Sequence, residues 1–146
     1  MKGFRMLGRM MYLIDTNVIS EVRKKRNADK GVKQFFKTVR DPVYLSVVTI
    51  GELRRGVEII RYRGDKRQAN LLEKWLDGVI ENYGNNILEF ALDEAIVWGR
   101  LRVPHHEHSL DKQIAATALT HGFTVVTRND RDFVATGVNV LNPFSH

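Results

Sequence analysis

Short apolar runs alternate with stretches of helical periodicity along the chain, and this alternation limits the folds available to it. The apolar runs predict strands at 12–15, 43–46, 86–90, 123–127 and 138–142. Apolar residues at helical spacing predict helices at about 17–39, with a break near the charged stretch RKKRNADKG, and at about 49–63, 66–83, 93–103 and 109–121. Apolar strands separated by helices are typical of a parallel sheet covered on both faces. We therefore expect an α/β fold in which a parallel sheet of about four or five strands lies between two layers of helices.

The length of 146 residues predicts one domain with a self-sufficient core. The sequence contains no cysteine, which excludes disulfides, thiolate metal ligands and a cysteine nucleophile. It has no signal-like apolar segment and no run of about 18 apolar residues, so we expect a cytoplasmic protein without membrane contact. Residues 1–10 are expected to be a dispensable extension, because Met6, Met10 and Met11 offer alternative starts, and residues 11–146 are expected to form the domain.

Acidic residues stand at or just after the carboxyl ends of two predicted strands. Asp15 ends the first apolar run, and Asp130 and Asp132 follow the run at 123–127. Each has a purely structural interpretation, because Asp15 can cap the next helix, Asp130 can cap a turn, and Asp132 can be an ordinary surface acid.

Two further acids stand near the beginning of predicted helices. The pair Thr49-x-x-Glu52 matches a capping box, in which the glutamate turns back on the threonine amide. Ser109 is a candidate N-cap with Asp111 in the following turn, where the helix dipole favours an acid whatever its function. Taken alone, neither acid requires a functional explanation.

Taken together, the acids predict a metal site. Positions that follow the strands of a doubly covered parallel sheet converge on one cleft, so these side chains are expected to crowd together. The acids concerned are Asp15, Glu52, Asp111 and either Asp130 or Asp132. Crowded carboxylates repel one another unless they are protonated or hold a cation. Oxygen ligands favour Mg²⁺ or Mn²⁺, and such a site can position a phosphodiester and activate a water for attack.

Positive charge predominates elsewhere in the chain. Lys and Arg number 23 against 17 Asp and Glu, which gives a formal net charge of +6. This balance is compatible with a polyanionic partner, although charged runs are often only solvated surface. Arg54 and Arg55 follow Glu52 closely, so we expect at least one of them to lie near the mouth of the cleft and to bind phosphate.

Three histidines lie upstream of Asp111 in the segment VPHHEHSL. His105, His106 and His108 could indicate zinc, but closely spaced histidines in a polar loop are more often solvated. We favour the solvated interpretation, and contact with a nucleic acid stays open.

Four motifs in order resemble the PIN-domain ribonucleases, in particular the VapC-type toxins of bacterial toxin–antitoxin pairs. They are LIDTNVIS, TIGELRRGV, LDKQIAATA and VVTRNDRDF, and the closing NVLNPF is similar to the last strand of the subgroup related to the FitB protein. The resemblance covers residues 11–144. It implies a three-layer α/β/α PIN-like domain, a Mg²⁺- or Mn²⁺-dependent endoribonuclease, a homodimer, and a small antitoxin that blocks the site.

The resemblance also implies roles for individual residues. Asp15, Glu52 and Asp111 fall on the family's metal-site acids, and for the fourth acid we favour Asp132, with Asp130 as the rival.

Four polar residues are expected to support these ligands through hydrogen bonds or water rather than to bind the ion directly. They are Thr16, Asn17, Thr127 and Asn129.

An antitoxin is expected to insert an arginine or lysine among the acids and to lay apolar residues along the two helices between Thr49 and Tyr83. Three alternatives stay open: a housekeeping nuclease, another phosphoesterase of the same fold, and a non-catalytic RNA-binding module.

Overall fold

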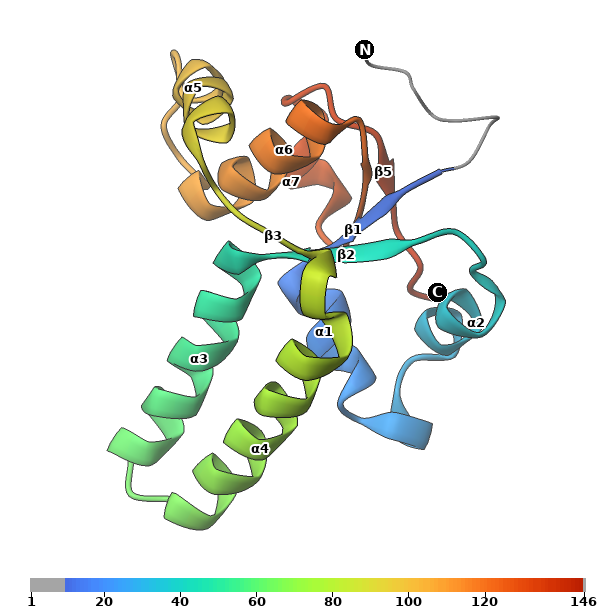
Figure 1. Ribbon diagram of the computed structural model, residues 1–146, viewed down its shortest axis with the longest axis vertical. Helices are drawn as coiled ribbons and strands as arrows, with labels where there is room; N and C mark the ends of the chain where they lie inside the picture. Colours follow the sequence, from blue (N-terminus) through green and yellow to red (C-terminus); the bar gives the residue numbers. More distant parts are fainter. Residues whose placement is uncertain (1–9, 146) are drawn as a thin grey trace.

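A five-stranded parallel sheet forms the centre of the computed structural model, which describes residues 10–145 (Figure 1). The strand order is β3-β2-β1-β4-β5. The strands are β1 (Tyr12–Ile14), β2 (Val43–Ser46), β3 (Ile87–Leu88), β4 (Thr124–Val126) and β5 (Val140–Leu141). Every neighbouring pair is parallel, so all carboxyl ends meet at one edge, with β1 in the middle. This arrangement confirms the predicted fold class; the expected extension at 1–10 lies outside the described residues except for Met10.

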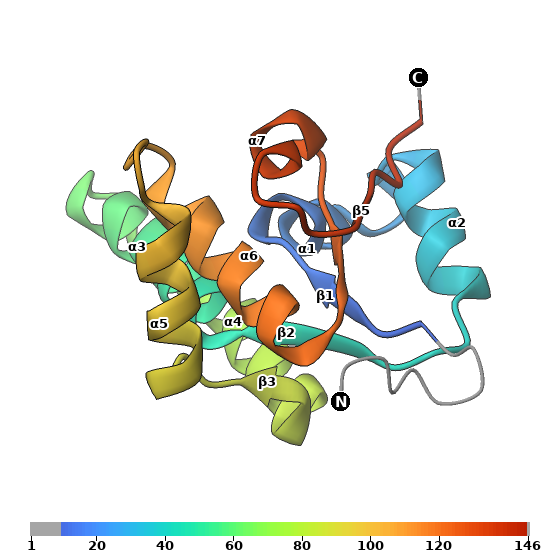
Figure 2. The ribbon, with the colours of Figure 1, turned by 90° about the horizontal axis from the view of Figure 1, so that it is seen from above.

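Seven α-helices and two short 3-10 helices connect the strands within residues 10–145. The helices are α1 (Thr16–Val22), α2 (Lys30–Thr38), α3 (Val47–Tyr62), α4 (Lys66–Tyr83), α5 (Leu92–Leu101), α6 (Ser109–His121) and α7 (Asp130–Val134), with the 3-10 turns η2 (Lys25–Asn27) and η3 (Gly84–Asn86). In Figure 1, α3 and α4 form a long antiparallel hairpin that projects away from the sheet. Figure 2 shows α5 beside α6, and these two helices pack against each other. Within residues 10–145, none of the helices has the length and apolar character of a membrane span.

Successive side chains of the central strands enter two separate cores. Ile14 and Val126 pack with residues of α1 to α4, whereas Leu13 and Val125 pack with residues of α6 and α7. All four side chains are fully buried. This alternation is the period of a β-strand, and it places one layer of helices on each face of the sheet (Figure 1).

The beginning of α3 differs from the prediction. The helix starts at Val47 rather than at Thr49, because the buried Ser46 at the end of β2 is its N-cap and accepts a hydrogen bond from the amide of Val48 at 3.0 Å. Thr49 therefore lies inside the first turn, and the predicted capping box between Thr49 and Glu52 is wrong.

The helices near the carboxyl end also differ from the prediction. α6 has His108 rather than Ser109 at its N-cap, and the short helix α7 was not expected. The segment 17–39 forms α1, η2 and α2, which confirms the predicted break. The outer strands are shorter than predicted, since β3 covers two of the residues in 86–90 and β5 two of those in 138–142.

The C-terminal segment crosses the beginning of α2. The Asp29 carboxylate caps that helix through the Gly31 amide at 2.8 Å and accepts hydrogen bonds from the Ser145 amide at 2.9 Å and the Ser145 hydroxyl at 2.6 Å. Chiefly because of the Ser145 bonds, the pKa of Asp29 falls to about 2. The backbone approaches so closely that a Cβ on Gly31 would lie 2.0 Å from the Pro143 carbonyl oxygen.

We predict that Gly31→Ala destabilises the protein by about 1–3 kcal/mol, because the added methyl group must displace the backbone of the C-terminal segment. The matched control is Gly78→Ala in α4, where a Cβ meets nothing within 4 Å. That variant should be neutral or up to about 1 kcal/mol more stable. Urea unfolding of both variants and the wild type measures the difference, and equal effects of the two substitutions would contradict the predicted contact.

Candidate active site

The carboxylate of Asp15 lies at the carboxyl end of the central strand β1 and is almost fully buried, with 4% of the residue exposed. One oxygen, Oδ1, accepts the Thr16 amide at 2.8 Å, so the residue is the N-cap of α1. The other, Oδ2, accepts the Thr127 hydroxyl at 2.8 Å and lies 3.4 Å from the Asn17 amide nitrogen. The capping interpretation of Asp15 is therefore correct, but capping occupies only one of its oxygens.

The Thr127 hydroxyl connects the ends of β1 and β4. Thr127 is fully buried, and its oxygen accepts the Asn129 amide at 2.9 Å while it donates to Asp15. Asn17 adds a second link, since its side-chain oxygen accepts the Arg128 amide at 3.0 Å. These bonds hold the Asp15 side chain in one orientation relative to the sheet.

Glu52 reaches the same region from α3. Its Oε1 lies 3.3 Å from the Thr16 hydroxyl oxygen, which is also 3.3 Å from the hydroxyl oxygen of Thr49. Glu52 thus contacts the first residue of α1 instead of folding back onto its own helix.

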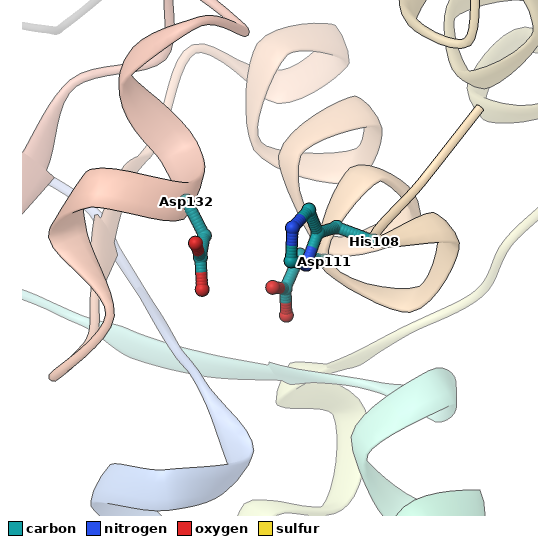
Figure 3. A group of neighbouring side chains, drawn as sticks. All are labelled: His108, Asp111 and Asp132. Carbon is teal, nitrogen blue, oxygen red and sulfur yellow. The ribbon is translucent and has the colours of Figure 1, made fainter. Parts of the chain in front are cut away.

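Asp111 and Asp132 approach from the other layer of helices. Asp111 lies in the first turn of α6, Asp132 lies on α7, and His108 directly precedes α6 (Figure 3). One potential ligand atom from each of these three side chains lies within 4.8 Å of the other two. Asp130, two residues before Asp132, is exposed and is not a member of this group.

Electrostatic coupling joins the acids from the two layers. The pKa of Asp111 is raised to about 6, first by burial and then by the charges of Asp15, Asp132 and Glu52, whereas His108 opposes the shift. Burial also raises the pKa of Asp15, with a smaller contribution from Glu52, against the hydrogen bonds from Thr127 and Thr16. We use the name acid cluster for Asp15, Glu52, Asp111 and Asp132.

Arg54 has partners on the helical hairpin. Its guanidinium lies 2.7 Å from the Glu73 carboxylate and 2.8 Å from Glu58, and Arg61 lies 2.8 Å from Glu73 on the other side. These ion pairs join α3 to α4. Arg55 is exposed three residues after Glu52. Phosphate binding by either arginine stays a prediction.

The sequence interpretation missed one residue of this region. His108 is exposed, as expected with His105 and His106, but its ring also lies near Asp111 and Asp132, which was not expected.

Comparison with known proteins agrees with this geometry. The model of the PIN domain matches residues 12–139. The chain belongs to the PIN-domain family. It is 34% identical to the toxin FitB of Neisseria gonorrhoeae over 92% of this chain and 99% of FitB, and 33% identical to a VapC ribonuclease of Sinorhizobium fredii over 92% and 98% of the two chains. The motif resemblance is therefore confirmed.

Solved structures of toxin–antitoxin complexes have the same fold as this PIN domain. The crystal structure of FitAcB from Neisseria gonorrhoeae matches with a TM-score of 0.80 and 33% identity, over 91% of this chain and 98% of that one. The structure of FitAB bound to a DNA fragment matches with a TM-score of 0.81 and 30% identity, over 93% and 97% of the two chains.

The donor atoms of this PIN domain fit a divalent cation. The acid cluster supplies oxygen ligands, and the pKa of Asp111 rises through burial first and then through repulsion from the charges of Asp15, Asp132 and Glu52. A cation among these carboxylates would remove that repulsion.

We predict that the metal-free protein loses stability as the pH rises through the Asp111 pKa of about 6. The folded state binds this proton more tightly than the unfolded state does, so its stabilising contribution is complete below the ordinary value of 3.8 and disappears above about 6. The Tm advantage of Asp111→Asn over the wild type should therefore be smallest at about pH 4, grow up to about pH 6 and stay constant at about pH 7.5. Asp130→Asn, at an exposed acid of the same region, is the control. A Tm difference between Asp111→Asn and wild type that does not change with pH would contradict the prediction.

Proposed function

We propose that this PIN domain is a Mg²⁺- or Mn²⁺-dependent endoribonuclease toxin that a small antitoxin neutralises. The observation that supports this most is the acid cluster at the carboxyl edge of the sheet, where burial and neighbouring carboxylates raise the pKa of Asp111 and of Asp15. Relatives of the same length bear the names toxin and VapC ribonuclease. A cytosolic location follows from the substrate, because an RNA-cleaving toxin acts where RNA is.

In this proposal, the acid cluster holds the cation. When bound, the cation would compensate the phosphodiester charge and lower the pKa of the attacking water. Asp15 and Glu52 hold it from the side of α1 and α3, and Asp111 and Asp132 from the side of α6 and α7. Asp111 must lose its proton to become a ligand, so metal binding should weaken as the pH falls below about 6.

The polar residues around Asp15 act as positioning residues. Thr127 donates to the Asp15 oxygen that does not cap α1, and Asn17 and the Asn129 amide donate to Thr127 in turn. Thr16 connects Asp15 with Glu52, because its amide bonds to the first and its hydroxyl to the second. These bonds restrict the carboxylates to one arrangement before a cation binds.

Arg55 is the better of the two predicted phosphate-binding arginines. It is exposed on α3 three residues beyond Glu52, whereas Arg54 is held by two glutamates. The whole chain has a net charge of +6 despite the acid cluster, and this excess of positive charge would attract RNA.

The antitoxin has two candidate docking surfaces. Exposed side chains of the α3–α4 hairpin, the surface expected from the sequence to receive the antitoxin, include Tyr62 and Leu71. A pocket of about 280 Å³ between α1 and α2 is the second. Its lining residues are Val22, Lys25, Ala28, Val32, Lys33, Phe36 and Lys37. The apolar lining with three lysines suits an amphipathic acidic segment.

A second copy of the chain would cover exposed apolar side chains on α5 and α6. Leu92 and Ile96 on α5 and Leu110 on α6 are exposed by 72%, 47% and 45%. Covering this surface is a reason for the proposed homodimer.

The proposal is tested by expressing the chain alone and beside its neighbouring open reading frame. We expect growth arrest and RNA fragmentation with the chain alone, and neither with co-expression. Asp15→Asn, expressed alone and shown to be folded, should be harmless. If the wild-type chain is folded and metal-loaded but harmless, the toxin function is contradicted. Hydrolysis of a phosphomonoester instead of single-stranded RNA would favour another phosphoesterase.

We predict that Asp132→Asn reduces RNA cleavage at least about a hundredfold, on the scale of a lost electrostatic contribution to the transition state. Asp130→Asn is the matched control, because it removes the same charge two residues away from an exposed position. It should cleave at nearly the wild-type rate. If Asp132→Asn is fully active and Asp130→Asn is inactive, Asp130 rather than Asp132 is the fourth acid of the metal site.

A further inference from the structure

We propose that His108 supplies a nitrogen ligand to the acid cluster, so that the site prefers Mn²⁺ to Mg²⁺. The inference rests on the proposed metal site and adds a residue to it. One ring nitrogen of His108 and one carboxylate oxygen each from Asp111 and Asp132 lie within 4.8 Å of one another (Figure 3).

These separations are close to those of ligands around one ion. Metal–oxygen bonds of about 2.1 Å place ligands on opposite sides of an octahedral ion about 4.2 Å apart. Atoms within 4.8 Å therefore need only small side-chain movements to surround a cation.

The backbone around His108 is fixed by contacts that do not involve the acid cluster. The His108 carbonyl accepts the Lys112 amide at 2.9 Å, and the Trp98 indole donates to the Ser109 carbonyl at 3.1 Å. The ammonium of Lys112, a residue only 8% exposed, donates to the carbonyl of His105 and closes the loop. His108 itself has φ 54° and ψ 45°, a left-handed conformation that directs its side chain toward Asp111.

The chemistry of the donor decides the preference for the metal. Mg²⁺ is a hard ion that selects oxygen ligands, whereas Mn²⁺ shares the preference for carboxylates but, as a first-row transition metal, binds an imidazole nitrogen better than Mg²⁺ does. A ligand set of carboxylates with one imidazole therefore favours Mn²⁺. The same ring also bears on Asp111 without a metal, since the charge of His108 lowers the Asp111 pKa.

The competing interpretation is that His108 only balances charge as an imidazolium and never binds the ion. Pulsed electron paramagnetic resonance of the Mn²⁺-loaded full chain separates the two, because a coordinated imidazole gives a ¹⁴N coupling. We expect this coupling in the wild type and its loss in His108→Asn. Asparagine is chosen because it tolerates the left-handed backbone, and the Tm of the variant reports whether the fold is kept.

His106→Asn is the matched control, since His106 is exposed in the same loop and is not in the group with Asp111 and Asp132. Calorimetric titration should show Mn²⁺ affinity reduced about tenfold or more in His108→Asn, with Mg²⁺ affinity changed less than about threefold. Both affinities should be unchanged in His106→Asn.

The outcomes also separate this inference from the proposed function. A wild-type Mn²⁺ spectrum without ¹⁴N coupling, or a coupling that persists in His108→Asn, overturns the role of His108. If Mn²⁺ binding is nevertheless lost in Asp111→Asn, the acid cluster remains the metal site. A wild type that binds neither Mn²⁺ nor Mg²⁺ at millimolar concentration overturns both proposals.

Discussion

The buried carboxylate of Asp15 is the constraint on which the site depends. A buried charge is stable only when hydrogen bonds satisfy it, and those bonds come from the first turn of α1 and from Thr127 after β4. One side chain therefore fixes where β1 ends, how α1 begins and how β4 aligns with β1. The same bonds leave a concentrated negative charge at the edge where Glu52, Asp111 and Asp132 also arrive. Fold and site share this residue, so neither can be changed alone.

Much of the fold followed from local patterns, because buried strands are short apolar runs and helices have a period of their own. The predicted helix boundaries were wrong where the sequence offered two possible caps for the same helix. At α3, both Ser46 and Thr49 can cap a helix, and only the end of β2 decides in favour of Ser46. The outer strands β3 and β5 are short because each has a single neighbour in the sheet.

The acid cluster was predictable because a parallel sheet brings its post-strand residues together. The choice between Asp130 and Asp132 depended on α7, a helix too short to show a period, which directs the second acid toward Asp111 and leaves the first exposed. The position of His108 was not predicted, because it depends on a left-handed backbone conformation that the sequence pattern does not reveal. Arg54 could not be assigned from sequence, since Glu73 lies on another helix.

In the proposed function, the repulsion within the acid cluster links metal binding to antitoxin binding. Any group that brings positive charge among these carboxylates is stabilised by the same field that raises the pKa of Asp111. A proton, a divalent cation and an inserted arginine or lysine therefore compete for one place. The expected antitoxin can inhibit RNA cleavage without matching the shape of RNA. A positively charged side chain that takes the place of the cation is sufficient to displace the cation from the site. Linkage is reciprocal. The cation should therefore lower the affinity of the cluster for the antitoxin by the same factor by which the antitoxin lowers its affinity for the cation. Competition with the cation lowers the affinity of the antitoxin for the cluster. Apolar contacts elsewhere, on α3–α4 or between α1 and α2, would then compensate for this loss of antitoxin affinity.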